Sequence, residues 1–333
     1  RHPRRRMTVS DDSGTYRASL GAAAAAIRGA SSVALACHVH PDGDALGSML
    51  ALHHVLAAAG IESVASFPEP FVIAPHYREL VGLECIRPPH EFPTAPDVMV
   101  TFDCGSLDRL GGFVPAARAA RELIVIDHHV SNDRYGTINV IEPTAAASGV
   151  VVRDLVAALG LELNRAAAVC LYTALVCDTG RFQYDSTTPA VFELAAELTA
   201  FDVPVSALSR SLFEEHRFAY LQLLAAVVQR AELDLGSGLV WTAIRQHDLE
   251  AFDVTMEEVE GLIDILRRTK EADVSVVLKE DADGSVRVSM RSLGRVDVCA
   301  IAQHHGGGGH RFAAGFTSHT GVDATIAAIR SAL

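Results

Sequence analysis

The sequence predicts an α/β protein with two domains: a doubly wound, mostly parallel N-terminal sheet and a smaller C-terminal α/β domain, with a cleft between them. The first half alternates short β-rich runs with helix-like stretches, which is the pattern of βαβ units. The second half changes to strands, helices and a hairpin. A chain of 333 residues, 49% of them hydrophobic, can bury two separate cores.

The elements of the first half follow one another in β-then-α order. Compact apolar runs predict buried parallel strands, and longer runs predict helices, one of which ends at Gly60. The predicted strands cover residues 32–39, 61–66, 97–102 and 122–126, and the predicted helices cover 45–59, 148–159 and 164–176.

A helical but interrupted stretch at 187–217, broken by Asp202 and Pro204, is interpreted as the connection between domains. It separates a first domain at 16–186 from a second at 218–333, and residues 1–15 are predicted to be a disordered leader. The second domain is expected to contain helices at 218–233, 255–268 and 298–305, a strand at 238–244, and a hairpin of 274–279 and 286–292 that turns at Asp283-Gly284.

Composition favours a cytoplasmic protein that does not associate with membranes. Its apolar stretches are interrupted before they reach the roughly 18 to 20 residues of a membrane span. The basic start is followed by polar residues, unlike a secretory signal. No CxxC pair occurs, which favours reduced thiols over a disulfide or zinc framework. The cysteines are Cys37, Cys85, Cys104, Cys170, Cys177 and Cys299.

The net charge of −13 argues against a long nucleic acid as partner, because such polymers are usually bound by a basic surface that releases many counterions. Short anionic substrates escape this objection. A few cationic side chains and bound metal ions can neutralise one or two phosphates locally.

Acidic and histidine side chains follow the predicted strands and helices in four clusters. These are His38, Asp42 and Asp44, then Asp103, then Asp127-His128-His129, and finally Asp178. Three clusters come directly after predicted parallel strands, whose carboxyl ends border the crevice of an open α/β sheet. We therefore expect the clusters to converge.

So many carboxylates repel one another unless cations lie between them. Oxygen ligands with a minority of imidazoles suit manganese or magnesium, and two ions about 3.5 to 4 Å apart would clamp a phosphate and activate water. Each cluster alone has an ordinary explanation: Asp44 could cap a helix, Asp103 could be a loop acid, and Asp178 could end a helix, where it needs a cation. The four together predict phosphoester hydrolysis.

A run of four glycines commonly forms a flexible linker, but Gly306–Gly309 lie between a predicted helix and an apolar segment at 312–316. Inside a domain, a backbone without side chains can approach a phosphate closely. His310 and Arg291 would add donor groups, although Arg291 could equally be a solvated charge at a strand end.

Residues 38–48, His-Val-His-Pro-Asp-Gly-Asp-Ala-Leu-Gly-Ser, together with Asp127-His128-His129, strongly resemble the DHH phosphoesterase superfamily. Gly306–His310 resemble its DHH-associated nucleotide-binding domain, so the resemblance covers nearly the whole chain. The layout is most similar to bifunctional oligoribonucleases that also act as 3′-phosphoadenosine 5′-phosphate phosphatases. Actinobacterial members of that group also hydrolyse cyclic di-AMP and its linear product pApA.

The resemblance implies two manganese ions per subunit, with magnesium or cobalt as substitutes. It assigns His38, Asp42 and Asp103 to one ion and Asp44, Asp103, His128 and Asp178 to the other, so that Asp103 bridges. It implies that His129 faces the phosphate and that Asp127 orients His128. The substrate-binding residues are expected to be Arg291, Gly307, Gly308, Gly309 and His310. Arg181 follows Asp178 closely in the chain and is predicted as a further phosphate contact. His40 stands where relatives often have Asn, and it is not placed among the ligands.

The implied substrates are short oligoribonucleotides, 3′-phosphoadenosine 5′-phosphate, pApA and cyclic di-AMP, which the sequence does not rank. A homodimer is also implied. Two alternatives stay open at this point: a RecJ-like single-strand exonuclease, and a non-catalytic sensor of cyclic dinucleotides. The complete ligand set counts against the sensor, and the acidic charge counts against the exonuclease.

Overall fold

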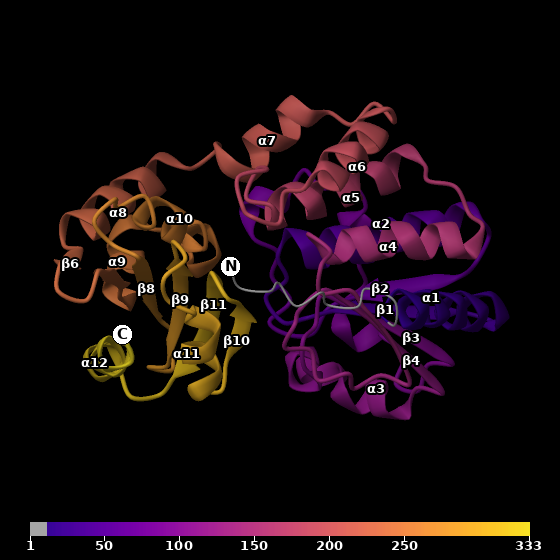
Figure 1. The fold of residues 1–333 in the computed structure, drawn as a ribbon, viewed down its shortest axis with the longest axis horizontal. Coiled ribbons are helices and arrows are strands. Elements are labelled where there is room, and N and C mark those ends of the chain that lie inside the picture. The colour runs from indigo at the N-terminus through magenta and orange to yellow at the C-terminus, as the bar shows by residue number, and fades with distance from the viewer. Residues whose placement is uncertain (1–11) are drawn as a thin grey trace, which may run out of the picture. The chain divides into compact units, whose positions relative to one another are not determined.

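The computed structural model describes residues 12–333, which form two compact units (Figure 1). The first contains residues 12–73 and Tyr77–Leu208, and the second contains Ala74–His76 and Ser209–Leu333. The division at Leu208 falls inside the stretch 187–217 that was interpreted as the connection. Residues 1–11 of the predicted leader lie outside the described residues. Its last four residues, 12–15, are helical, so the prediction of disorder was wrong for them.

The first unit is built on a sheet of five parallel strands in the order β2-β1-β3-β4-β5, which confirms the predicted doubly wound class. Its strands are β1 (Val33–Cys37), β2 (Ser63–Ser66), β3 (Val98–Phe102), β4 (Glu122–Asp127) and β5 (Ile138–Ile141). Its helices are α1 (Asp12–Gly29), α2 (Gly43–Ala58), α3 (Val114–Ala119), α4 (Ser148–Leu159), α5 (Arg165–Asp178) and α6 (Pro189–Thr199), and α7 (Val205–Phe213) contains the division at Leu208. Short 3-10 turns include η4 (Leu107–Phe113).

Helices cover both faces of this sheet. Strands β1 and β3 are buried along their whole length, as their continuous apolar sequences require. Helices α2 and α4 lie on one face and α3 lies on the other (Figure 1). The sheet thereby brings the carboxyl ends of β1, β3 and β4 side by side.

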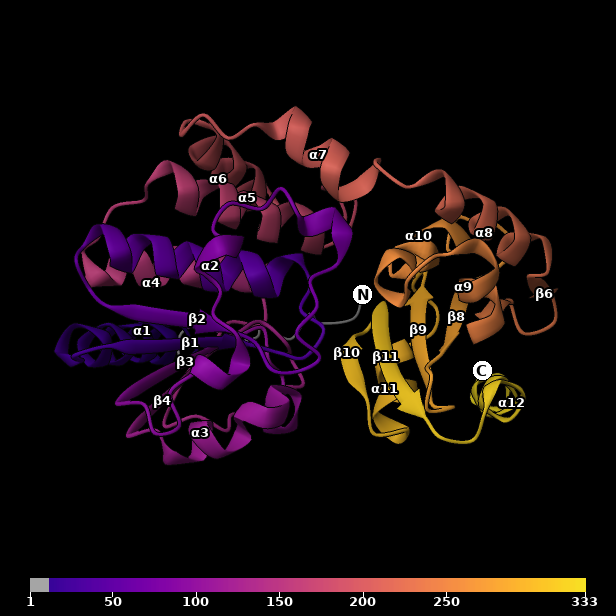
Figure 2. The same cartoon turned by 180° about the vertical axis from the view of Figure 1, so that it is seen from behind.

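The second unit is a mixed sheet of six strands in the order β10-β11-β9-β8-β7-β6. Its strands are β6 (Glu232–Asp234), β7 (Leu239–Ile244), β8 (Val274–Glu280), β9 (Val286–Ser292), β10 (Gly308–His310) and β11 (Ala313–Ser318). Its helices are α8 (Phe218–Gln229), α9 (Gln246–Phe252), α10 (Leu262–Leu266), α11 (Val298–His304) and α12 (Val322–Ser331). Helices α8 and α10 pack on one face and α11 and α12 pack on the other (Figure 2).

Two predicted helices of this unit were wrong in extent. The helix predicted over 218–233 ends at Gln229, because the chain from Glu232 onward pairs with β7 as a strand. The helix predicted over 255–268 is divided into η5 (Met256–Val259) and α10, with Gly261 between them. Glycine is a poor helix former, so this break agrees with its low propensity.

All six cysteines are free, as the absence of CxxC pairs predicts. Within residues 12–333, no helix has both the length and the apolar character that crossing a lipid bilayer requires.

Candidate metal centre

The side chains predicted as metal ligands converge at the carboxyl ends of β1, β3 and β4. Their ligand atoms form compact groups whose members lie within 4.8 Å of one another. One group is His38, Asp42 and Asp103, and another is Asp44, His128 and Asp178. The structure thus brings together all six residues that the sequence proposed as ligands.

Asp103 lies between the two groups and directs one carboxylate oxygen toward each. Its Oδ2 is 3.6 Å from Nε2 of His38, and its Oδ1 is 3.5 Å from Nε2 of His128. The residue follows β3 with a left-handed backbone conformation, φ +53°, which turns its side chain out of the strand. This placement is what a carboxylate bridging two cations requires.

The turn between β1 and α2 holds His38 and Asp42 of the first group in place. Asp42, not Asp44, is the N-cap of α2, and its Oδ1 accepts from the backbone N–H of Asp44 and Ala45 at 3.1 and 3.0 Å. Nδ1 of His38 lies 2.8 Å from the carbonyl of Val39 and 2.7 Å from Nη2 of Arg109. One nitrogen cannot both donate and accept. The Arg109 guanidinium can only donate, so its contact needs an accepting Nδ1, whereas donation from Nδ1 to Val39 would leave the Nε2 lone pair toward Asp103, the arrangement that metal ligation requires.

The second group gathers around His128, which is almost completely buried. Its Nδ1 lies 3.1 Å from the carbonyl of Ala145, so this nitrogen carries the proton. Its Nε2 then faces Oδ2 of Asp178 at 3.0 Å and Oδ2 of Asp44 at 3.7 Å. Asp178 is the last residue of α5, where a carboxylate opposes the helix dipole, and a cation held between it and His128 would compensate this.

The buried carboxylate of Asp44 is held by groups that the sequence did not single out. Its Oδ1 accepts from the hydroxyl of Ser48 at 2.9 Å and from the N–H of Gly149 at 3.0 Å. Its Oδ2 accepts from the N–H of Ser148 at 2.6 Å, and the hydroxyl of Ser148 donates to Asp103 at 3.0 Å. The spacing of Ser48 one helical turn after Asp44 could have indicated the first contact. The others bring together residues that are 45 or more positions apart.

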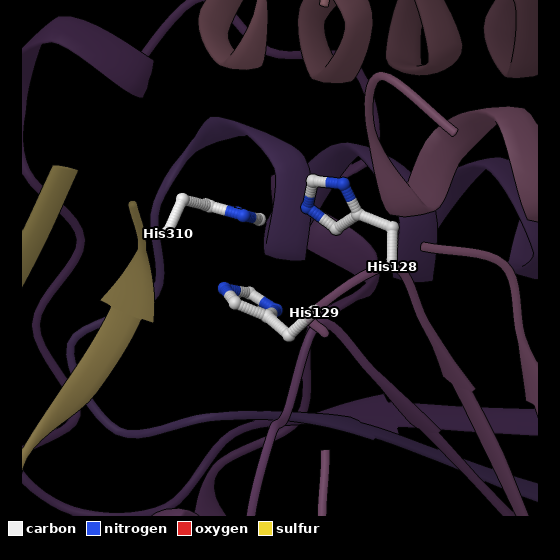
Figure 3. A group of neighbouring side chains, drawn as sticks. All are labelled: His128, His129 and His310. Carbon is white, nitrogen blue, oxygen red and sulfur yellow. The ribbon is translucent and has the colours of Figure 1, made fainter. Parts of the chain in front are cut away.

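The role predicted for Asp127 is corrected: its carboxylate contacts the ring of His129, not that of His128. Oδ1 of Asp127 accepts from Nδ1 of His129 at 2.7 Å, while it contacts His128 through the backbone N–H, also at 2.7 Å. The two imidazoles are 5.0 Å apart and inclined at 65° (Figure 3). Adjacent histidines therefore have different supports, one from a carboxylate and the other from a carbonyl.

The charges of this cluster depend on one another. Burial, followed by the charge of Asp103, raises the pKa of Asp44 well above its usual value. Burial lowers the pKa of His128, but the carboxylates of Asp178, Asp44 and Asp103 raise it well above the ordinary range. Burial opposes ionisation of Asp103 as well, yet its neighbouring imidazoles hold its pKa below the usual value. Without cations the cluster retains protons, which divalent ions would displace.

The residues present fit divalent metal ions. Four carboxylates and two imidazoles meet in two groups, Nε2 of each imidazole faces Asp103, and that one carboxylate faces both groups. Hard cations such as manganese and magnesium prefer this donor set. His40 lies outside these groups, exposed and with φ +50°, which agrees with leaving it off the ligand list.

The second half of the glycine run, Gly308 and Gly309, belongs to strand β10 of the second unit. Gly308 pairs with Gly315, and Gly309 pairs with Ala314. A Cβ at Gly307 would lie 2.1 Å from the carbonyl of Gly315, and one at Gly309, where φ is +135°, would lie 2.5 Å from that of Ala313. The run is therefore close-packed at Gly307 and Gly309 and open at Gly306 and Gly308, and it lies inside the unit, as its context indicated, instead of forming a flexible linker.

Arg291 and His310 lie in one row across this sheet, because both pair with Ala313 from opposite sides. Directly opposite residues of antiparallel strands project to the same face. The next row is Gly308, Gly315 and Ser289, so bare backbone adjoins the two basic side chains. Ser289 was not anticipated. Arg291 is oriented by donation from Nη1 to the carbonyl of Met290 at 3.1 Å, with Oδ1 of Asp264 3.7 Å from its Nε.

Arg181, the remaining predicted phosphate contact, follows α5 in the first unit. It is partly buried with φ +63°, and its backbone N–H donates to the carbonyl of Val176. It lies three residues after Asp178 in the chain, and its contact with a phosphate stays a prediction.

Comparison with known proteins agrees with this architecture. The model of the DHH family, N-terminal domain, matches residues 32–175, and that of the DHHA1 domain matches residues 239–333. The bifunctional oligoribonuclease and PAP phosphatase NrnA of Thermus thermophilus is 35% identical over 285 residues, 85% of this chain and 83% of the relative. The protein of the same name from Bacillus subtilis is 27% identical, over 84% and 86% of the two chains.

More distant similarities extend this picture. The cyclic-di-AMP phosphodiesterase GdpP of Geobacillus thermodenitrificans is 27% identical over 202 residues, which cover 57% of this chain and 29% of that protein. A crystal structure of an exopolyphosphatase-related protein from Bacteroides fragilis has a TM-score of 0.83 at 22% identity and covers 95% of both chains, so it shares the fold. The chain belongs to the DHH family of phosphoesterases, with its DHH domain in the first unit and its DHHA1 domain in the second.

Proposed function

We propose that this protein hydrolyses the phosphoester bonds of short oligoribonucleotides and small nucleotides with two manganese ions per subunit. The main support for this proposal is the position of Asp103, whose two carboxylate oxygens face His38 in one donor group and His128 in the other. The substrates are suggested by the names of the relatives: NrnA for oligoribonucleotides and 3′-phosphoadenosine 5′-phosphate, and GdpP for cyclic di-AMP.

Two bound cations would supply an activated water and neutralise charge on the phosphate. The protein's own side chains would hold the ions, stabilise the developing charge and bind the nucleotide. His38, Asp42, Asp103, Asp44, His128 and Asp178 hold the ions. Burial lowers the pKa of His129, but the carboxylates of Asp127 and Asp103 raise it overall, which favours the imidazolium. With Nδ1 donating to Asp127, this imidazolium would donate from Nε2 to a phosphoryl oxygen, where negative charge builds as the nucleophile attacks. Arg291 and His310, beside the glycine strand, bind the nucleotide.

Metal removal tests the centre directly. The protein stripped with a chelator is expected to be inactive, and added manganese is expected to restore hydrolysis and raise the melting temperature, because a ligand that binds only the folded state stabilises it. Magnesium and cobalt titrations in parallel would rank the ions. Full activity of the chelated protein, with no metal detected by mass spectrometry, would refute the metal centre.

The substrate class is tested with a panel of pApA, 3′-phosphoadenosine 5′-phosphate, cyclic di-AMP and a longer RNA, read by product chromatography. Rapid release of AMP from pApA, with the longer RNA nearly intact, is the expected result. Processive degradation of the longer RNA would favour a RecJ-like exonuclease instead. Binding of cyclic di-AMP without hydrolysis of any substrate, in the presence of manganese, would favour a sensor.

Replacing Arg291 with alanine is expected to raise KM for pApA by about 10- to 100-fold with kcat changed only a few-fold, the effect of losing a charge-assisted phosphate contact. Arg268→Ala is a matched control, since it removes the same charge from an exposed position of the same unit. Steady-state kinetics on both variants checks this. A fall in kcat with KM unchanged would contradict a purely binding role for Arg291.

The homodimer implied by the resemblance stays a prediction. Size-exclusion chromatography with light scattering would measure it against the subunit mass of 35.4 kDa.

A further inference from the structure

Asn132 connects the ends of two neighbouring strands of the first unit. Its amide Nδ2 donates to Oδ2 of Asp127 at 2.5 Å and to the carbonyl of Cys104 at 3.2 Å. Asp127 ends β4, and Cys104 directly follows Asp103 at the end of β3. One amide group therefore links the carboxylate that supports His129 to the backbone beside the bridging carboxylate.

The orientation of this amide is determined by its own loop. Oδ1 of Asn132 accepts from the backbone N–H of Arg134 at 2.7 Å, and the backbone N–H of Asn132 donates to the carbonyl of His129 at 3.1 Å. Only the NH₂ group can donate to a carboxylate, and it is the end that faces Asp127. The loop thus presents a donor, and not an acceptor, to the Asp127 side chain.

Asp127 depends on this donor because its carboxylate is completely buried. Its Oδ1 accepts from the backbone N–H of His128 and of His129 and from Nδ1 of His129. Among residues 12–333, the hydrogen bond recorded for its Oδ2 is the one from Asn132. Loss of Asn132 would leave a buried carboxylate oxygen without its donor, and the carboxylate would be free to rotate away from His129.

We propose that Asn132 is a positioning residue for the reaction: it fixes the Asp127 carboxylate, which accepts from Nδ1 of His129 and so directs the Nε2 edge of that ring toward the substrate phosphate. This inference rests on the proposed function, because it assigns the way in which His129 is held there. Mutation of a residue that supports a functional histidine by a hydrogen bond commonly lowers affinity or activity by about 10- to 100-fold.

Kinetics of a double-mutant cycle provide the first test. Asn132→Ala is expected to lower kcat for pApA by about 10- to 100-fold with KM changed little, and to cause no further loss in a His129→Ala background. Asn139→Ala is the control. The Asn139 side chain hydrogen-bonds to the backbone of Gly136 in the same connection between β4 and β5, but it does not contact Asp127. An equal loss in the wild-type and His129→Ala backgrounds would overturn the proposal.

Nitrogen-15 NMR of ring-labelled histidines, with diamagnetic magnesium in place of manganese, gives a readout independent of turnover. The protected Nδ1–H signal of His129 is expected in the wild type and in Asn139→Ala, and is expected to be lost in Asn132→Ala or the less disruptive Asn132→Ser. Retention of that signal in folded Asn132 variants would overturn the proposal. A wild type inactive on every substrate would refute the proposed function but leave this readout intact.

Discussion

Asp103→Asn is expected to lower kcat/KM for pApA by about 10³-fold or more, the largest loss of any single substitution in the centre. The carboxylate faces both donor groups, with His38 Nε2 at 3.6 Å and His128 Nε2 at 3.5 Å. A neutral amide offers one oxygen and no charge, so it cannot bridge two cations. Steady-state hydrolysis and metal content, measured together on the purified variant, check this.

Asparagine is a better replacement here than alanine because Asp103 has φ +53°. Asparagine tolerates the left-handed region, so the variant changes the ligand with little added backbone strain. Asp108→Asn is the control, since it removes one negative charge at an exposed position of the same connection. Substantial metal-dependent activity in Asp103→Asn, within about ten-fold of Asp108→Asn, would show that Asp103 does not bridge.

Gly47→Ala is expected to destabilise the first unit by about 1–3 kcal/mol or more, because it inserts a methyl group where two helices touch. Gly47 of α2 packs directly against α5. A Cβ built there would lie 2.5 Å from the carbonyl oxygen of Cys170 and 3.0 Å from the backbone nitrogen of Ala174. Both are backbone atoms, which cannot rotate aside, so the helices would have to separate.

Gly21→Ala is the matched control, because Gly21 also lies in a helix but a Cβ there would have no atom within 4 Å. It is expected to raise stability by about 0.5–1 kcal/mol through helix propensity. Thermal melting by circular dichroism would compare the variants. Fluorescence of Trp241, the one tryptophan, reports on the second unit and should change less. A Gly47→Ala melt like that of Gly21→Ala would contradict the close packing.

Local pattern was sufficient to predict the fold class of this protein and the convergence of its acidic and histidine clusters. An apolar run as short as Val98–Phe102 favours a buried strand. The acids and histidines that follow such strands lie close together, because the carboxyl ends of adjacent parallel strands share one edge. The helix over Ser148–Leu159 was predicted with its observed bounds. Its apolar face recurs with helical period, and Gly160 ends it with φ +67°.

Contacts between distant segments were decided only by the tertiary structure. Nothing near Asp44 in the sequence indicates Ser148, 104 residues away, whose backbone N–H reaches its carboxylate. Likewise, Asp127 is adjacent to His128 in the chain but supports the ring of His129, since the direction of each side chain follows from the backbone dihedrals at the strand end. Periodicity reports which face a residue occupies; which atoms meet there depends on how separate elements pack, and that is a property of the whole fold.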